Sequence, residues 1–333
     1  MKASKWINRN IVAPVLFYSG ISDIILRSNR QKILVLNYHG VVHGNYLEIN
    51  NKHLSVIEFE KHLKLIAKKF QPIKYSEADL PYYGKKPRVV ITFDDGFQNN
   101  FTVALPLLKK YKIPAVFFVS AVAASKNDPI IWPDFIESLC FLRTGKEISF
   151  DDFTFNYHGR LVFIDSKHKQ NIFSFFKKLG KDERTRIIDF LNAKYGVEDF
   201  IRKKPREFWA LMNKEEISAL ANVHEDFFSV GSHGYDHYNL ANIPEAEMGY
   251  ELDFSKKILE KVTNKQVDSI AFPDGNYNQK VAESCLKSGY KFLFGVNENQ
   301  LKDKGINVIS RFSVSSTTNH YVNFLSMVKA TKG

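Results

Sequence analysis

The sequence is poor in several features that define common protein classes. It has only 2 cysteines among 333 residues. Neither Cys140 nor Cys285 has a second Cys or a His at zinc-ligand spacing, so we expect two reduced, buried thiols and no disulfide framework. The longest apolar run, residues 11–26, is interrupted by Pro14, Gly20 and Asp23. This run is too broken for a membrane-spanning helix, which needs about 20 apolar residues.

Acidic residues are in the minority, with 36 Asp and Glu against 47 Lys and Arg and a formal net charge of +11. Such a surplus favours an anionic partner, such as nucleic acid, a phosphorylated sugar carrier or an anionic membrane face. The basic residues are spread along the chain without an RNA-binding or helix-turn-helix pattern, so we expect a solvated basic surface and no nucleic acid partner. The length and the hydrophobic fraction of 44% suit one large globular barrel.

Residues 1–30 form a candidate amphipathic helix that precedes the main domain, residues 31–333. We favour a helix that lies on an anionic membrane, which would place the protein in the cytoplasm, at the inner membrane face. A helix packed on the barrel and a signal peptide for export are the alternatives, although no small-x-small cleavage pattern follows. If the helix lies on a membrane, the apolar side chains in contact with lipid are Trp6, Leu16, Phe17, Ile21, Ile24, Ile25 and Leu26. The basic side chains near the headgroups are Lys2, Lys5, Arg9 and Arg27.

From residue 31 onward, short apolar runs alternate with helical patterns. The runs are nearly continuous rather than alternating, as in parallel strands that are covered on both faces. This order predicts an α/β fold with a parallel sheet, plausibly a closed barrel. The predicted strands are Ile33–Tyr38, Arg88–Phe93, Ala115–Val119, Phe227–Ser232, Asp268–Phe272, Lys291–Val296 and Ile306–Ser310, and the predicted helices begin at Ser55 or cover Thr102–Tyr111, Pro244–Val262 and Gln279–Ser288.

The segment 125–216 interrupts this alternation. It mixes aromatic and charged residues, and helical patterns occur at Pro133–Leu142, Lys167–Phe176 and Asp182–Ala193. We interpret it as a helix-rich insertion that overhangs the active site.

Two motifs indicate a catalytic metal site. The apolar run Val89–Phe93 is followed directly by Asp94, Asp95 and Gly96. Barrel enzymes place catalytic groups at the carboxyl ends of their strands. The run ending at Ser232 is followed by His233 and His237, which would face the same way on a helical turn and hold one metal ion. Alone, the first motif is equally typical of a turn and the second of a surface histidine pair. Together they make a two-histidine, one-carboxylate set that leaves positions open for water and substrate.

At this point the chain resembles the polysaccharide deacetylases of the NodB homology family, carbohydrate esterase family four. Their first motif, T-F-D-D-G, matches Thr92–Gly96, and their second, His-Ser/Thr-x-x-His, matches His233–His237. Their third, Arg-x-Pro-x-Gly, is matched in part by Ala271–Gly275. The order of the motifs agrees, and the resemblance covers roughly residues 31–315.

The resemblance implies a distorted (β/α) barrel of seven or eight strands. It implies Asp94 as the general base and Asp95, His233 and His237 as ligands of one divalent ion, most simply Zn²⁺, with Co²⁺, Ni²⁺ or Fe²⁺ as alternatives. The third motif points to substrate binding by Pro273, Gly275 and Tyr277.

The chain departs from the family pattern at three places. Gly234 replaces a Ser or Thr whose hydroxyl orients a ligand, and Ala271 stands where an Arg would orient the base. We expect Arg311 to supply that charge from the end of the last predicted strand. The motif that carries the proton donor has no clear copy, which leaves His39 and His320 as candidates, with His39 preferred because it ends a strand.

The sequence therefore predicts a metal-dependent hydrolase that removes acetyl groups from N-acetylated sugars of a surface polysaccharide or its precursor. The partner would be an acetylated oligo- or polysaccharide, or a lipid-linked or nucleotide-linked sugar. A sugar-binding relative without activity and an O-acetyl esterase are the alternatives.

Overall fold

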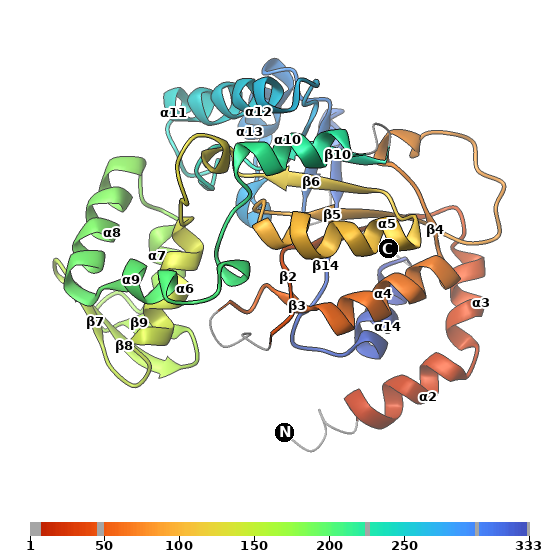
Figure 1. Ribbon diagram of the computed structural model, residues 1–333, viewed down its shortest axis with the longest axis horizontal. Coiled ribbons are helices and arrows are strands. Elements are labelled where there is room, and N and C mark those ends of the chain that lie inside the picture. Colours follow the sequence, from red (N-terminus) through yellow and green to blue (C-terminus); the bar gives the residue numbers. More distant parts are fainter. Residues whose placement is uncertain (1–7, 45–49, 224–226, 297–299, 332–333) are drawn as a thin grey trace.

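The computed structural model describes residues 8–44, 50–223, 227–296 and 300–331. Its main element is a parallel sheet whose strands follow the order β13-β12-β11-β10-β6-β5-β1-β14, with the short β4 (Gln71–Pro72) paired to β5 beside this path (Figure 1). The sheet forms a nearly closed barrel of eight strands with helices around it, as predicted. The strands are β1 (Ile33–Tyr38), β5 (Arg88–Phe93), β6 (Ala115–Val119), β10 (Phe228–Ser232), β11 (Ser269–Ala271), β12 (Phe292–Gly295), β13 (Val308–Ser310) and β14 (Phe312–Ser313).

One short segment joins the two ends of the sheet. β13 pairs with β12 through Val308–Ser310, whereas β14 pairs with β1 through Phe312–Ser313. Only Arg311 separates these two strands in the sequence. The same extended segment therefore reaches from one edge of the barrel to the other, and Arg311 lies at the junction.

The strand pattern explains the continuous apolar runs. Side chains of successive strand residues point to opposite faces, and both faces of these strands are covered. Val35, Val90, Val116, Phe118 and Phe294 belong to a cluster inside the barrel. Their neighbours along the strands pack outward against the helices, and all six residues of β5 are buried.

The helices that cover the barrel agree with the predicted ones, with local differences. α4 (Val56–Lys69) begins as predicted, with the Ser55 side chain accepting a hydrogen bond from the Glu58 amide. In place of the predicted helix 102–111, the structure has a short π-helix, Asn100–Ala104, followed by α5 (Leu105–Tyr111). The predicted helix 244–262 contains a similar short π-helix, η6 (Tyr250–Phe254). The others are α10 (Lys214–Asn222), α11 (Glu245–Gly249), η6 (Tyr250–Phe254), α12 (Ser255–Thr263), α13 (Gln279–Lys287) and α14 (His320–Ala330).

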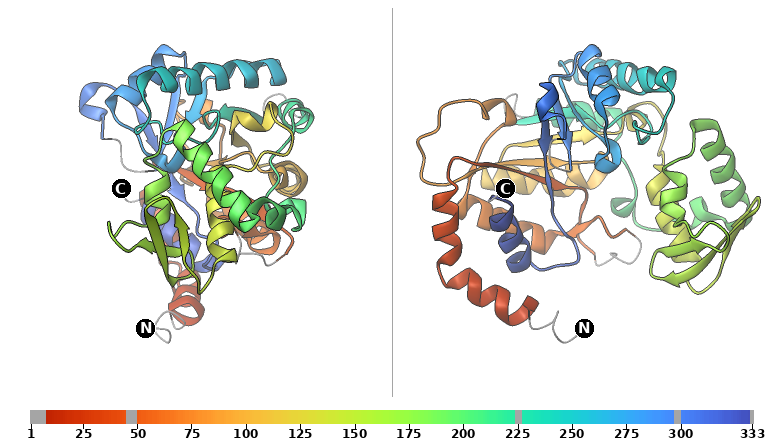
Figure 2. Two further views of the ribbon diagram at one scale, coloured as in Figure 1. Left: turned by 90° about the vertical axis from the view of Figure 1, so that its left-hand side faces the viewer. Right: turned by 180° about the vertical axis from the view of Figure 1, so that it is seen from behind.

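The insertion forms a lobe beside the barrel with an apolar core of its own (Figures 1 and 2). Two of its predicted helices are present over nearly the predicted length, and the third is shorter. A three-stranded antiparallel sheet, which the sequence analysis did not predict, lies among them. The helices are α6 (Trp132–Leu142), α7 (Ile172–Phe176), α8 (Lys181–Tyr195) and α9 (Val197–Arg202), and the strands are β7 (Ile148–Phe150), β8 (Phe153–Gly159) and β9 (Val162–Asp165).

The N-terminal segment is not the single helix that we predicted. After a π-turn at Asn8–Val12, α2 (Ala13–Tyr18) and α3 (Ile21–Ser28) meet at an angle of 61°. Gly20 lies between them with φ of +78°, a left-handed conformation that glycine adopts at no steric cost. Within the described residues, no single helix has both the length and the apolar character to cross a membrane, although Asn10–Tyr18 and Ile21–Ser28 would pass that test as a bent pair. Lys2, Lys5 and Trp6 lie outside the described residues.

A buried histidine on α4 makes the stability of the fold dependent on pH. Burial lowers the pKa of His62 to about 4, although the charge of Glu58 opposes this shift. In the unfolded chain the pKa is about 6.5, so the unfolded state binds more protons between these values. His62 therefore lowers the free energy of unfolding as pH falls from about 6.5 to about 4. In His62→Gln, urea unfolding should show a shallower pH dependence over this range, by up to about 1.4 kcal/mol per pH unit.

A matched substitution at the exposed His158, His158→Gln, should leave the wild-type pH dependence unchanged. An unchanged slope in His62→Gln would contradict the assignment.

Candidate active site

Both predicted motifs lie at the carboxyl ends of barrel strands. Asp94 and Asp95 follow β5, and the two histidines follow β10. Immediately after Asp94 the chain turns sharply, because Asp95 has φ of +72° and Gly96 has φ of +82°. A Cβ atom at residue 96 would lie 2.9 Å from the Val119 side chain, so only glycine fits this turn. The turn separates the surroundings of the two adjacent carboxylates.

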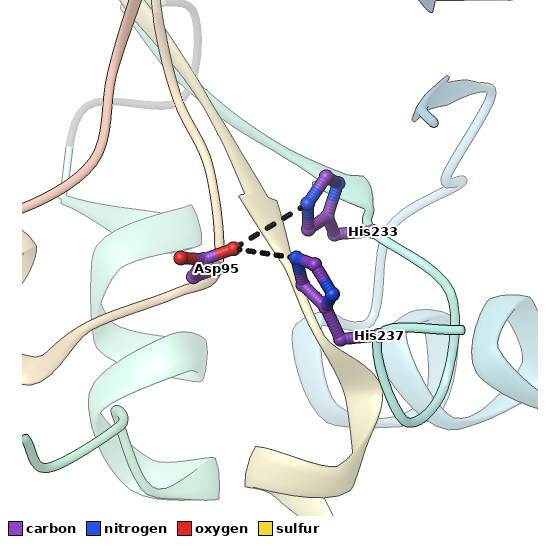
Figure 3. Close-up of side chains that lie close together, drawn as sticks. All are labelled: Asp95, His233 and His237. Atoms are coloured by element: carbon purple, nitrogen blue, oxygen red, sulfur yellow. Dashed lines mark ion pairs between the residues drawn. The ribbon is translucent and has the colours of Figure 1, made fainter. Parts of the chain in front are cut away.

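Asp95, His233 and His237 form a group that fits one metal ion (Figure 3). The Nε2 atoms of His233 and His237 lie 3.4 and 3.2 Å from Asp95 Oδ1. Asp95 is completely buried, and its Oδ1 atom has no hydrogen-bond partner. A buried carboxylate oxygen without such a partner is costly unless a cation compensates it. The donor set and this unsatisfied oxygen therefore fit a divalent ion with three protein ligands.

Each of the two histidines accepts or donates a hydrogen bond outside the metal group, His233 through its ring and His237 through its backbone. Its Nδ1 atom lies 2.9 Å from the carbonyl oxygen of Ala271. A carbonyl only accepts, so Nδ1 carries the proton and Nε2 presents its lone pair toward Asp95. Trp132 of the insertion donates its indole N–H to the carbonyl oxygen of His237, at 2.8 Å. The insertion thus contacts the backbone of a candidate metal ligand.

We predicted that the two histidines lie on a helical turn. That prediction was wrong, because they lie in an irregular loop. Gly234 has φ of +73° and His237 φ of +56°. The buried carboxylate of Glu251 accepts hydrogen bonds from the amides of Tyr235 and Asp236, at 2.8 and 3.1 Å. A Cβ atom at residue 234 would lie 3.3 Å from Glu251 Oε2. Glu251 therefore fixes this loop where the family has a hydroxyl at position 234.

Arg311 lies against Asp94, as its place at the end of the last predicted strand suggested. Two nitrogens of its guanidinium contact the two carboxylate oxygens at 2.6 and 2.9 Å, and Asn37 donates to Oδ2 at 3.0 Å. Burial raises the pKa of Asp94, but the charge of Arg311 and the hydrogen bonds from Arg311 outweigh this effect. The pKa of Asp94 is thus held below its usual value, and the carboxylate is ionised at neutral pH.

Lys52 is a residue of the site that sequence reasoning missed. Its Nζ atom bridges Asp95 Oδ2, at 3.1 Å, and Asp134 Oδ1 of α6, at 2.8 Å. Burial lowers the pKa of Lys52, but the charges of Asp134 and Asp95 outweigh it, so the net shift is upward and the ammonium stays charged. Asp95 therefore divides its two oxygens between the histidines and Lys52. No local pattern marks Lys52, because its two partners come from distant parts of the chain.

The remaining predicted residues have varied surroundings. His39 follows β1, and burial lowers its pKa to about 4 against the opposing charges of Asp95 and Asp94, so its ring is neutral near pH 7. His320, the first residue of α14, instead contacts Glu58 of α4, and its Nδ1 atom lies 3.1 Å from Glu58 Oε2. Pro273 and Gly275 are buried in the turn after β11. The Tyr277 ring stacks on Phe272, and its hydroxyl accepts from the Gln300 amide at 3.2 Å. Substrate binding by Pro273, Gly275 and Tyr277 stays a prediction.

Comparison with known protein families bears on the chain as a whole. Residues 82–159 and 147–293 match the family model described as polysaccharide deacetylase. The chain belongs to the polysaccharide deacetylase family. It is 24% identical to the Bacillus subtilis protein YxkH, over 85% of this chain and 72% of that protein. It is also 34% identical to the poly-beta-1,6-N-acetyl-D-glucosamine N-deacetylase of Staphylococcus aureus, but only over 28% of this chain and 38% of that enzyme.

Solved structures of deacetylases share the fold. The Streptococcus pyogenes deacetylase PplD, solved in complex with acetate, superposes with a TM-score of 0.54 at 17% identity, covering 89% of this chain and 98% of that one. IcaB from Ammonifex degensii gives a TM-score of 0.53 at 16% identity, with 91% and 97% of the two chains covered. At these identities the likeness shows the barrel alone.

Removal of one ligand should abolish tight metal binding. We expect His237→Ala to weaken Zn²⁺ or Co²⁺ binding by at least about 100-fold, because two ligands cannot replace a three-ligand site. Isothermal titration of the metal-free protein measures the affinity, and Co²⁺ absorption reports the coordination. His158→Ala, at an exposed histidine of β8, is the control and should bind like the wild type. Equal affinity in the two variants would show that the metal binds elsewhere.

Proposed function

We propose that the chain is a metal-dependent hydrolase that removes the acetyl group from N-acetylated sugars of a surface polysaccharide or its precursor. One observation above all supports this: an ionised carboxylate held by Arg311 lies next in the chain to the carboxylate that completes the candidate metal group. A base and a metal site side by side suit hydrolysis of an amide by water.

Each residue of the site has a distinct task in this reaction. A divalent ion held by Asp95, His233 and His237, most simply Zn²⁺ with Co²⁺, Ni²⁺ or Fe²⁺ as alternatives, would polarise the acetyl carbonyl and make water more acidic. Asp94 accepts the proton of the attacking water. Its Oδ2 atom already accepts from Arg311 and Asn37, but Oδ1 accepts only from Arg311, and since a carboxylate oxygen has two lone pairs, acceptor capacity remains on Oδ1. Arg311 and Asn37 keep the carboxylate in one orientation throughout.

The last step transfers a proton to the departing amine nitrogen as the bond from carbonyl carbon to nitrogen breaks. Acetate and the free amino sugar are the products. Because His39 is neutral near pH 7, it can donate only after it has received a proton. In this mechanism Asp94, once protonated by the attacking water, would supply that proton. His39 remains the preferred relay to the amine.

Two alternatives start from the same site. The absence of an Arg at residue 271 and of the family's proton-donor motif would suit a relative that only binds carbohydrate. The contacts of Arg311 with Asp94 weigh against this, because binding alone does not need an oriented base. The second alternative is an O-acetyl esterase, whose leaving oxygen depends less on protonation than the nitrogen of an amide does.

The substrate class follows from similarity and charge. The Staphylococcus aureus relative is named for poly-beta-1,6-N-acetyl-D-glucosamine, and a lipid-linked precursor of a polymer of this type is our first candidate. The net charge of +11 also suits a nucleotide-linked or lipid-linked sugar, which carries phosphate. We place the protein in the cytoplasm, at the inner membrane face, with export by a signal peptide as the alternative.

The direct test is the release of acetate from N-acetylglucosamine oligomers. Protein stripped of metal should be inactive, and reloading with Zn²⁺, Co²⁺ or Ni²⁺ should restore the reaction. Asp94→Asn should retain the metal and lose at least about 100-fold in kcat, because an amide cannot accept the proton. Asp189→Asn, at an exposed aspartate of α8, is the matched control and should keep the wild-type rate.

The outcomes separate the alternatives. Full activity of Asp94→Asn would refute its role as the base. Release from O-acetylated sugars alone would identify an esterase. Metal binding without release from either class would favour the sugar-binding relative.

A further inference from the structure

Exposed apolar side chains gather on the N-terminal arm, by which we mean Asn8–Ser28. Of the fifteen large apolar side chains that are exposed in the described part of the chain, seven lie in this arm. Val15 is 61% exposed and Ile24 66%. Single exposed apolar residues are ordinary, but a contiguous patch marks a surface that another apolar phase covers. The seven are Ile11, Val12, Val15, Leu16, Tyr18, Ile21 and Ile24.

The opposite face of the arm is fixed to the body of the protein. The Phe17 ring packs against Phe324 and Tyr321 of α14, with centroids 5.1 and 5.2 Å apart. Asp23 forms an ion pair of 2.6 Å with Lys69 at the end of α4. The arm is therefore a folded part of the molecule at its periphery (Figures 1 and 2). Its apolar face is exposed although the helices themselves are docked.

A basic hollow lies between α3, the end of α4 and residues 85–87. It is lined by Arg27 in the last turn of the arm and Arg30 just after it, by Lys68 and Lys69 of α4, and by Lys85 and Lys86, together with Asp23, Leu26 and Pro87. Asp23 is the one acidic residue of this lining, and Lys69 already pairs with it. The other five cations form no ion pair with any carboxylate in the described residues.

We propose that the arm and the basic hollow together bind the surface of a bilayer that contains anionic phospholipids. The apolar face would enter the boundary between headgroups and acyl chains, and the hollow would take lipid phosphates. Charge argues for lipid over a second copy of this chain, because a symmetric dimer through this face would bring two basic hollows together. The arm would lie along the surface, because one of its faces is docked on α14 and α4 through Phe17 and Asp23 and no single helix in it is long and apolar enough to span a bilayer.

This inference is independent of the proposed reaction. The arm enters β1 at its amino end, whereas Asp94 and Asp95 follow the carboxyl end of the neighbouring parallel strand β5. Substitutions in the arm should therefore leave metal binding and acetate release in solution unchanged.

Vesicle flotation of the full chain tests the proposal. We expect binding to vesicles of phosphatidylglycerol and phosphatidylcholine, at least about tenfold stronger than to phosphatidylcholine alone, and weaker in high salt. The triple variant Val15→Ser, Ile21→Ser, Ile24→Ser should lose at least about tenfold in binding to the mixed vesicles. The triple variant Arg27→Gln, Arg30→Gln, Lys85→Gln should lose the preference for anionic lipid.

Matched controls change the same chemistry elsewhere on the surface. Ile57→Ser, at a residue that is also 66% exposed, and the triple variant Lys203→Gln, Lys287→Gln, Lys302→Gln should bind like the wild type. The proposal is overturned if the wild type binds no vesicle, or if the arm variants bind as well as their controls. It is also overturned if the bound chain resists alkaline carbonate extraction, which marks a spanning segment, or if the serine variant only converts a dimer in solution to a monomer.

Discussion

The buried ion pair between Asp94 and Arg311 is the interaction on which barrel and site both depend. Arg311 is completely covered at its side chain, and its guanidinium contacts both oxygens of the carboxylate. Removing either partner would leave a buried charge without compensation, which typically costs about 3–5 kcal/mol. The segment that joins the two edges of the sheet is therefore fixed to β5 by the same contact that orients the candidate base. Stability of the closed barrel and readiness for chemistry are coupled in one pair of side chains.

A single backbone turn gives two neighbouring aspartates different surroundings. Asp94 continues the direction of β5, and its amide donates to the Tyr38 carbonyl oxygen at 2.9 Å. Asp95 adopts a left-handed conformation and points its Oδ1 atom toward the two histidines. One carboxylate consequently has a guanidinium partner, and the other has two imidazoles and an ammonium. Repulsion between adjacent carboxylates, which would otherwise raise one pKa, is offset on both sides.

Much of the barrel could be predicted from the sequence, because strands covered on both faces need continuous apolar runs. The bounds of β1, β5 and β6 agree with the prediction to the residue. β14 has two residues and leaves no such run. The π-helix Tyr250–Phe254 lies between α11 and α12 without a break in the helical run, so it was hidden in the predicted helix. In the insertion, the sheet of β7–β9 packs its own core rather than the barrel's, and its mixed aromatic and charged residues show no clear alternation.

In the candidate site, too, only features that are local in the sequence could be predicted. The adjacent aspartates and the paired histidines are visible because each motif is local in the sequence. Lys52 and Glu251 act through partners that lie far away in the chain, and no spacing rule connects them. The helical turn predicted for the histidines was wrong because a spacing of four residues also suits a loop with two left-handed positions, at Gly234 and His237.

The order of the strands in the chain has a consequence for synthesis. A growing chain holds every candidate metal ligand once residue 237 has been made, but β13, Arg311 and β14 come near its end. Domains form progressively as a chain emerges. In an incomplete chain, Asp95, His233 and His237 can therefore all be present while the barrel is still open and Asp94 still lacks its guanidinium partner. The candidate metal group is thus complete in the chain before the candidate base has the partner that orients it.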